Sequence, residues 1–169
     1  MEDLIPSKGT KHKFPMTAVP DRQLPLIAGR YEVVSRLTGG MGLVFLCRDQ
    51  ATSELVALKT FKPEYLSHRV ARDLFLREGT MWVELGSHPN IVRAHRVERI
   101  GDGREVYLVL EWIVQPKGKD NPSLRAWLRP GRPLRLQQAL AFALHITRGM
   151  KYATRKLPGL VHRDLKPEN

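Results

Sequence analysis

Short apolar-rich runs, separated by turn residues, dominate the middle of the chain. Five such runs cover residues 31–37, 43–48, 54–61, 91–100 and 106–111. Runs of this length that are rich in apolar and β-branched residues are typical of strands, and glycines separate the first two runs and the last two. The pattern therefore predicts an antiparallel sheet of five short strands.

Two longer segments show helical spacing instead. Over residues 69–85 the apolar positions that fall on one side are Val70, Leu74, Met81, Trp82 and Leu85. A second helix is predicted over residues 136–155, ended by Pro158 and Gly159, with a buried side made of Leu136, Leu140, Ala143, Leu144, Thr147 and Met150. Residues 1–28 contain four prolines among polar residues and predict an irregular leader. The fold class is therefore α+β, a sheet with one inserted helix followed by the start of a helical region.

Composition excludes several functional classes. The net charge is +11, but the basic residues are spread along the chain and no aromatic residues interleave with them, so nucleic-acid binding is not the expected primary function. Cys47 is the single cysteine, which excludes an internal disulfide and favours a reducing, cytoplasmic location. The sequence contains neither a signal-like apolar segment near the N-terminus nor an apolar stretch of about 18 residues.

The last eight residues, 162–169, carry the clearest chemical signal. They read H-R-D-L-K-P-E-N and resemble the catalytic loop of eukaryotic-type protein kinases, H-R-D-L-x-x-x-N. The resemblance implies that Asp164 accepts the proton of the attacking hydroxyl and that Asn169 binds a magnesium ion. Lys166 resembles the lysine that serine/threonine kinases direct at the transferred phosphate, so this subclass is expected.

A glycine-rich segment over residues 38–44, T-G-G-M-G-L-V, resembles the phosphate-binding loop of the same family. Gly39 and Gly42 match the second and third glycines of that loop, Gly40 lies between them, and the first glycine is missing. Glycines let backbone N–H groups approach phosphates without obstruction by Cβ atoms. A glycine-rich hairpin turn is the plainer explanation when this segment is taken alone.

Lys59 ends the run V-A-L-K, which resembles the V-A-I-K strand of kinases. Glu78 falls within the predicted apolar stripe of the first helix, where an unpaired carboxylate is costly. We therefore expect Glu78 to approach the Lys59 ammonium within about 4 Å and to orient this lysine toward the ATP phosphates. Glu84 is the competing carboxylate, although it lies outside the predicted stripe.

The run Y-L-V-L-E-W-I over residues 107–113 resembles the last strand and hinge of the smaller kinase lobe. The resemblance makes Leu110 the residue behind the adenine, and it implies that the Glu111 carbonyl and the Ile113 N–H bind the adenine edge. The residues expected to form the apolar slot for adenine are Leu37, Val44 and Ala57.

These matches predict a kinase-like fold with a small lobe and hinge over residues 29–113 and the start of a helical lobe over residues 114–169. The expected function is transfer of the ATP γ-phosphate to serine or threonine of protein substrates, with Mg²⁺. The 169 residues contain no D-F-G motif, activation segment or peptide-docking helices, so we expect this chain to be inactive alone and to expose the apolar side of its second helix. The alternative is a catalytically dead nucleotide-binding or scaffolding module. The retained Lys59, Glu78, Asp164 and Asn169 argue against that alternative for the whole protein.

Overall fold

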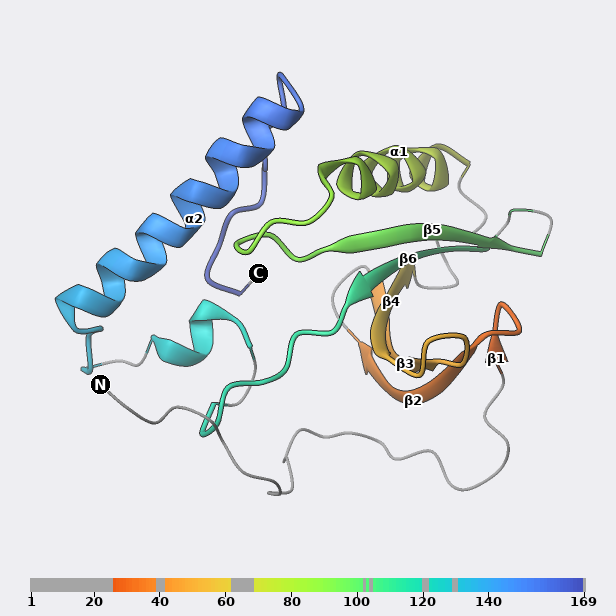
Figure 1. Cartoon of the computed structure of the whole chain (residues 1–169), viewed down its shortest axis with the longest axis horizontal. Coiled ribbons are helices and arrows are strands. Elements are labelled where there is room, and N and C mark those ends of the chain that lie inside the picture. Colours follow the sequence, from red (N-terminus) through yellow and green to blue (C-terminus); the bar gives the residue numbers. More distant parts are fainter. Residues whose placement is uncertain are drawn as a thin grey trace.

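A computed structural model describes residues 26–38, 42–61, 69–101, 103, 105–119, 122–128 and 131–168. Its main element is a six-stranded antiparallel sheet with the strand order β1-β2-β3-β4-β6-β5 (Figure 1). The strands are β1 (Leu26–Ile27), β2 (Tyr31–Thr38), β3 (Gly42–Asp49), β4 (Leu55–Phe61), β5 (Ala94–Ile100) and β6 (Glu105–Glu111).

The prediction of five strands was wrong by one. The additional strand, β1, has two residues and pairs with the start of β2, Leu26 opposite Glu32 and Ile27 opposite Tyr31. Segment 1–28, predicted to be irregular, therefore ends in a short strand, and residues 1–25 lie outside the described residues. The predicted strand over 91–100 begins later, at Ala94, because Ile91 forms an isolated bridge with His88 in the preceding turn.

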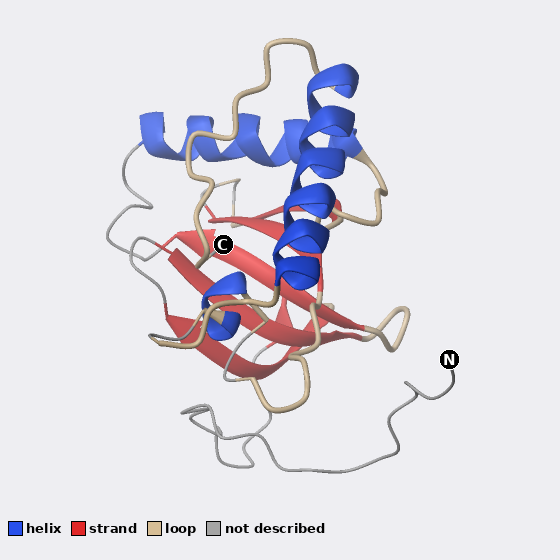
Figure 2. Ribbon diagram, turned by 90° about the vertical axis from the view of Figure 1, so that its left-hand side faces the viewer, coloured by secondary structure: helices blue, strands red, loops and turns tan. Residues whose placement is uncertain are grey.

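Helix α1 (Arg69–Leu85) lies on one side of the sheet (Figures 1 and 2). Its buried residues are Phe75, Gly79 and Leu85, whereas Val70 and Leu74 are 73% and 61% exposed. The predicted apolar stripe was therefore wrong for its N-terminal half. A Cβ atom on Gly79 would lie 3.1 Å from Val97 of β5, so the glycine lets the helix approach this strand closely.

The sheet has an apolar core on each face. The core under α1 consists of Ala57, Phe75, Ala94, Val106, Leu108 and Leu110. The core on the opposite face consists of Tyr31, Val33, Cys47, Val56, Leu58 and Val109. Burial raises the pKa of the Cys47 thiol to about 12, so this side chain acts as a small apolar residue.

A charged cluster surrounds the buried Asp49 carboxylate beside the second core, where β2 begins and β3 ends. The Asp49 carboxylate accepts hydrogen bonds from the Arg30 guanidinium at 2.6 and 2.8 Å and from Arg96 at 3.2 Å. Arg96 also contacts Tyr31, whose hydroxyl donates to Glu98 at 2.8 Å. The cluster thus links β2, β3 and β5 across the sheet.

A connecting segment with a short 3₁₀ helix (Leu124–Trp127) leads from β6 to helix α2 (Leu136–Lys156). The Trp127 ring packs edge-on against Phe142, with ring centroids 5.6 Å apart, which ties this segment to α2. The predicted helix over 136–155 is confirmed, with one more residue at its end. The predicted buried side was wrong for this chain, because the buried residues of α2 are Gly149 and Ala153. Leu136, Leu140 and Leu144 are 73%, 60% and 48% exposed, which confirms the expected exposure of the apolar side.

The C-terminal half of α2 packs against the turn between α1 and β5. A Cβ atom on Gly149 would lie 2.8 Å from the Asn90 carbonyl oxygen, so only glycine permits this approach. The Tyr152 hydroxyl donates to the Leu85 carbonyl at 2.6 Å, and its ring stacks on His88 at 4.5 Å between centroids. These contacts join α2 to the end of α1.

Candidate functional site

The strand register brings five of the predicted site residues onto one face of the sheet. Leu37 lies opposite Val44, and Val44 lies opposite Lys59. Ala57 lies opposite Leu110. Directly paired residues point to the same face, and so do residues two apart on one strand such as Ala57 and Lys59. Since this face also carries the core under α1, Ala57 and Leu110 are buried, while Leu37, Val44 and Lys59 are only half-buried.

The glycine-rich segment is described only at its end. Gly39 and Gly40 lie outside the described residues, and Gly42 is the first residue of β3. A Cβ atom on Gly42 would lie 3.1 Å from the Thr60 carbonyl oxygen, so the close approach of β3 to β4 favours glycine there. This third glycine thus has a packing role in the sheet.

The predicted hinge begins where β6 ends. The Glu111 N–H donates to the Arg93 carbonyl at 2.9 Å, and the Glu111 carboxylate accepts from the Arg93 N–H at 2.6 Å. Glu111 is therefore fixed on both its backbone and its side chain. Ile113 follows in extended chain and is 39% exposed, and no described residue accepts a hydrogen bond from its N–H.

The predicted ion pair between Lys59 and Glu78 is absent from the described part of the chain. Glu78 is exposed, because its neighbour Gly79 faces β5 and successive residues of a helix point about 100° apart. Glu84, the competing carboxylate, is exposed as well.

Trp82 occupies the side of α1 that was expected to present Glu78 to the lysine. The Lys59 ammonium lies 6.0 Å from the centroid of the Trp82 ring, at the outer limit of a cation–π contact. The indole N–H of Trp82 donates to the Val92 carbonyl at 2.7 Å, which fixes the ring. The sequence pattern placed Trp82 in the apolar stripe but gave no indication that it neighbours Lys59. Its position one helical turn after Glu78 was the available signal.

The loop after α2 places Asp164 beside Lys166. The Lys166 ammonium lies 2.9 Å from both carboxylate oxygens of Asp164, and both side chains are accessible, Lys166 at 47% and Asp164 at 63%. The Asp164 N–H donates to the His162 carbonyl at 2.8 Å, and Arg163 between them has a positive φ of 61°. The tight turn therefore turns the Asp164 side chain outward, toward solvent.

The end of this loop is held by the segment that precedes α2. The Arg125 N–H donates to the Pro167 carbonyl at 2.7 Å, and the Arg125 side chain lies 3.7 Å from Glu168. Figure 1 shows the loop running back alongside α2 from its C-terminal end. An accessible carboxylate held next to a cation can accept a proton while the cation stabilises negative charge on a bound group.

Among the described residues, no group of three or more His, Cys, Asp or Glu side chains could hold a metal ion. Asn169, the predicted magnesium ligand, lies outside the described residues. No helix in the described part of the chain is long and apolar enough to cross a membrane.

Comparison with known proteins identifies relatives of nearly the whole described chain. The sequence pattern of the family described as "Protein kinase domain" matches residues 31–169. The "Probable serine/threonine-protein kinase PknB" of Lactococcus lactis is 30% identical over 146 residues, which span 85% of this chain and 22% of that protein. The "Serine/threonine-protein kinase PknA" of Mycobacterium tuberculosis is 33% identical over 147 residues, which span 85% of this chain and 32% of that protein. The chain thus spans about a fifth to a third of the length of these two relatives.

A solved structure supports the same fold. The crystal structure of the PknI kinase domain of Mycobacterium tuberculosis matches 86% of this chain and 55% of that chain, with a TM-score of 0.68 and 23% identity. At this identity the match shows the fold. The sheet, α1 and α2 therefore have the arrangement found in part of a protein kinase domain.

Proposed function

This chain belongs to the protein kinase family, and we propose that the protein carrying it transfers the γ-phosphate of ATP to serine or threonine hydroxyls of protein substrates. Lys166 supports the serine/threonine subclass, and so does the similarity to the serine/threonine-protein kinases of Lactococcus lactis and Mycobacterium tuberculosis. A cytoplasmic location is part of the same proposal, since Cys47 is a free thiol and ATP is abundant there.

The observation that carries the proposal is the contact of Lys166 with both carboxylate oxygens of Asp164, at 2.9 Å. In the proposed reaction, Asp164 accepts the proton of the attacking hydroxyl. Lys166 stabilises the negative charge on the phosphoryl group as it leaves ATP. Both groups are accessible, so a substrate hydroxyl can approach the carboxylate from solvent.

We propose that the half-buried end of the sheet face under α1 binds the nucleotide. Leu37, Val44 and Ala57 offer an apolar surface for the adenine, and the Ile113 N–H, which has no acceptor among the described residues, offers a donor to its edge. Lys59 lies on the same face and has no carboxylate partner among the described residues, so its ammonium is available to ATP phosphates.

We also propose that the protein binds Mg²⁺ through one side-chain amide oxygen together with the phosphate oxygens of ATP. An amide oxygen and phosphate oxygens are ligands that Mg²⁺ accepts in octahedral geometry, and it usually keeps several waters. In this proposal the protein ligand is Asn169, which matches the asparagine of the H-R-D-L-x-x-x-N motif. The ion, when bound, would neutralise charge on the phosphates.

A second candidate function is a catalytically inactive nucleotide-binding or scaffolding module. The separation of Lys59 from Glu78 favours it, since in kinases this pair aligns the lysine with the phosphates. In that case nucleotide binding persists without phosphoryl transfer, which a kinetic comparison distinguishes.

The test is a phosphorylation assay on the full-length protein with labelled ATP, Mg²⁺ and peptides that differ only in serine, threonine or tyrosine. Asp164→Asn should lower transfer to serine about 10² to 10⁴-fold, the range for losing a positioned general base. The affinity of the variant for nucleotide should stay within about twofold of the wild-type value, because in the proposed reaction Asp164 acts on the substrate hydroxyl and not on the adenine.

Asp73→Asn is the matched control, because Asp73 is an exposed carboxylate on α1 whose Arg69 partner lies 3.7 Å away. It should leave the rate unchanged. Equal rates for the Asp164→Asn protein and the wild type would reject the assigned base. Nucleotide binding without any transfer in the wild type would support the second candidate.

A further inference from the structure

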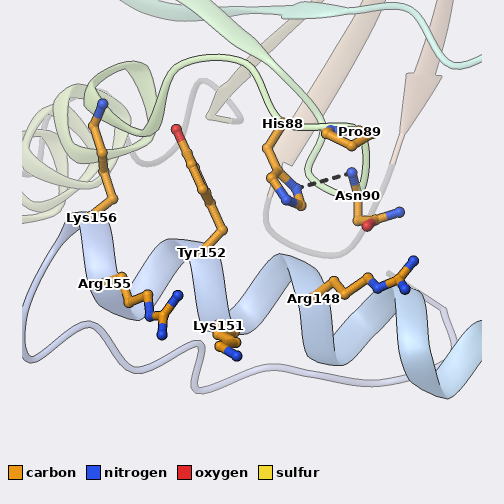
Figure 3. A pocket seen from close by; sticks show the side chains of 8 residues that line it. All are labelled: His88, Pro89, Asn90, Arg148, Lys151, Tyr152, Arg155 and Lys156. Carbon is orange, nitrogen blue, oxygen red and sulfur yellow. Dashed lines mark hydrogen bonds between the residues drawn. The ribbon is translucent and has the colours of Figure 1, made fainter.

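A pocket of about 630 Å³ lies between α2 and the turn that joins α1 to β5 (Figure 3). It shares no residue with the candidate phosphoryl-transfer site. Its lining residues are His88, Pro89, Asn90, Arg148, Lys151, Tyr152, Arg155 and Lys156. The pocket therefore combines one helix wall with one turn wall.

The helix wall is strongly basic. Arg148, Lys151, Arg155 and Lys156 are spaced three, four and one residue apart, so the first three lie along one side of α2. All four are exposed, and none forms an ion pair with an acidic side chain in the described part of the chain. The described residues that line the pocket include no aspartate or glutamate.

Favourable interaction with the helix dipole explains only part of this charge. Arg155 and Lys156 lie in the last turn of α2, where cations are stabilised by the C-terminal partial charge. Arg148 and Lys151 lie earlier, and the dipole effect falls off within the last turn. The helix dipole therefore does not account for Arg148 and Lys151, whose positive charges give the pocket an additional attraction for anions.

The turn wall is held in place by contacts on both sides. The Tyr152 hydroxyl is bonded to the Leu85 carbonyl, and its ring stacks on His88. The Asn90 N–H donates to Nδ1 of His88 at 3.1 Å, the bond drawn in Figure 3. Because Nδ1 is an acceptor here, the neutral His88 ring carries its proton on Nε2, which adds a donor to the pocket.

We propose that this pocket binds a phosphorylated, acidic segment of a polypeptide. Arg148 and Arg155 lie two turns apart on one side of α2, and each guanidinium can bind phosphate or carboxylate oxygens through paired N–H donors. Arg148 and Arg155 are seven residues apart, about 10 Å along the helix, a span that about three residues of extended peptide cover. A phosphoryl group flanked by carboxylates would therefore match the four cations in both charge and length.

A polypeptide fits the lining better than a nucleic acid does. Single-stranded nucleic acids use aromatic rings that stand apart as platforms for successive bases. The two rings in this pocket, Tyr152 and His88, stack on each other, at 4.5 Å between centroids. The remaining lining groups are cations, Pro89 and Asn90, which suit a peptide backbone and anionic side chains.

The test measures binding of fluorescent probes to the full-length protein by anisotropy, with saturating ATP so that the nucleotide site is occupied. The probes are an acidic peptide with one phosphoserine, the same peptide with serine, a single-stranded oligonucleotide of equal charge, and phosphatidylserine vesicles. The pocket variant is Arg148→Gln with Arg155→Gln. The matched control is Arg132→Gln with Arg135→Gln, which removes the same charge from exposed positions before the start of α2.

We expect the phosphoserine peptide to bind at least about tenfold more tightly than the serine peptide. The pocket variant should weaken that binding about tenfold or more, the effect of losing two charge-assisted contacts, and the control should change it less than about twofold. Far-UV circular dichroism checks that both variants are folded. Equal losses in the two variants would show general attraction to a basic protein and overturn the proposal. Tighter, pocket-dependent binding of the oligonucleotide or the vesicles would overturn it as well.

Discussion

The Asp49 cluster allows a stability effect to be worked out from contacts. The Asp49 side chain is only 3% exposed and accepts two hydrogen bonds from Arg30, one from Arg96 and one from the Ala51 N–H. The Arg30 guanidinium, followed by the Ala51 N–H and Arg96, lowers the pKa of Asp49 to about 2. The perturbation is Asp49→Asn, which keeps the shape of the side chain and removes its charge.

The lowered pKa sets the magnitude. The difference between about 2 and the ordinary aspartate value near 3.9 corresponds to about 2.5 kcal/mol of unfolding free energy at neutral pH. The side chains of Arg30 and Arg96 are 34% and 36% exposed, and solvent screening at such sites reduces the effect. We therefore expect Asp49→Asn to lose about 1 to 2 kcal/mol at pH 7.

The pH dependence of the stability difference tests the buried carboxylate more specifically than its size at pH 7 does. Because the folded-state pKa lies below the unfolded-state value, the stabilisation is present above about pH 4 and is lost as the pH falls toward about 2. About half of the difference between wild type and Asp49→Asn should therefore remain at pH 3. Urea unfolding of both proteins between pH 3 and 7 measures it.

Asp73→Asn is the matched control, because Asp73 is 59% exposed and faces Arg69 at 3.7 Å. This change should cost less than about 0.5 kcal/mol and show little pH dependence. Equal losses for the two variants, or a difference for Asp49→Asn that stays constant down to pH 3, would refute the reasoning from the buried carboxylate.

Two further predictions concern α2. Gly149→Ala should destabilise the protein by about 1 to 3 kcal/mol despite alanine's better helix propensity, because the new methyl group would lie 2.8 Å from the Asn90 carbonyl oxygen. Urea unfolding measures this effect, and a stabilised variant would contradict it. Leu140→Glu with Leu144→Glu should reduce self-association of the 169-residue chain in sedimentation experiments, because these exposed side chains form part of an apolar surface. Gln137→Glu adds an exposed charge without removing an apolar group and should leave association nearly unchanged.

The parts of the fold that sequence predicted best depend on local pattern. Strands β2, β3 and β4 agree within one residue with the predicted runs over 31–37, 43–48 and 54–61. Successive side chains of a strand point to opposite sheet faces, and this alternation leaves a local pattern in the sequence. Strand β1 was missed because two residues carry no periodicity, and only its pairing with β2 defines it. The sequence indicated the strands on which Leu37, Val44, Ala57, Lys59 and Leu110 lie, but only the strand register in the structure places these residues on one face.

The face of α1 was harder to predict, because apolar residues occur around much of the helix. The structure buries Phe75, Gly79 and Leu85, whereas the predicted stripe began with Val70 and Leu74. Glycine carries little weight in an apolar pattern, yet Gly79 lies at a close approach of the helix to the sheet. A glycine inside an otherwise regular helix was the available sign of close packing.

The distance between Lys59 and Glu78 is a tertiary property, set by how α1 is rotated about its axis. Gly79 fixes that rotation by facing Val97, and Trp82 reinforces it through its hydrogen bond to the Val92 carbonyl. A rotation that turned Glu78 toward the sheet would carry Gly79 away from β5 and place a bulkier side chain in the gap. Pairing Lys59 with Glu78 therefore competes with the packing observed here. The residue types that phosphoryl transfer needs can all be present in the sequence while the helix orientation still decides whether they meet.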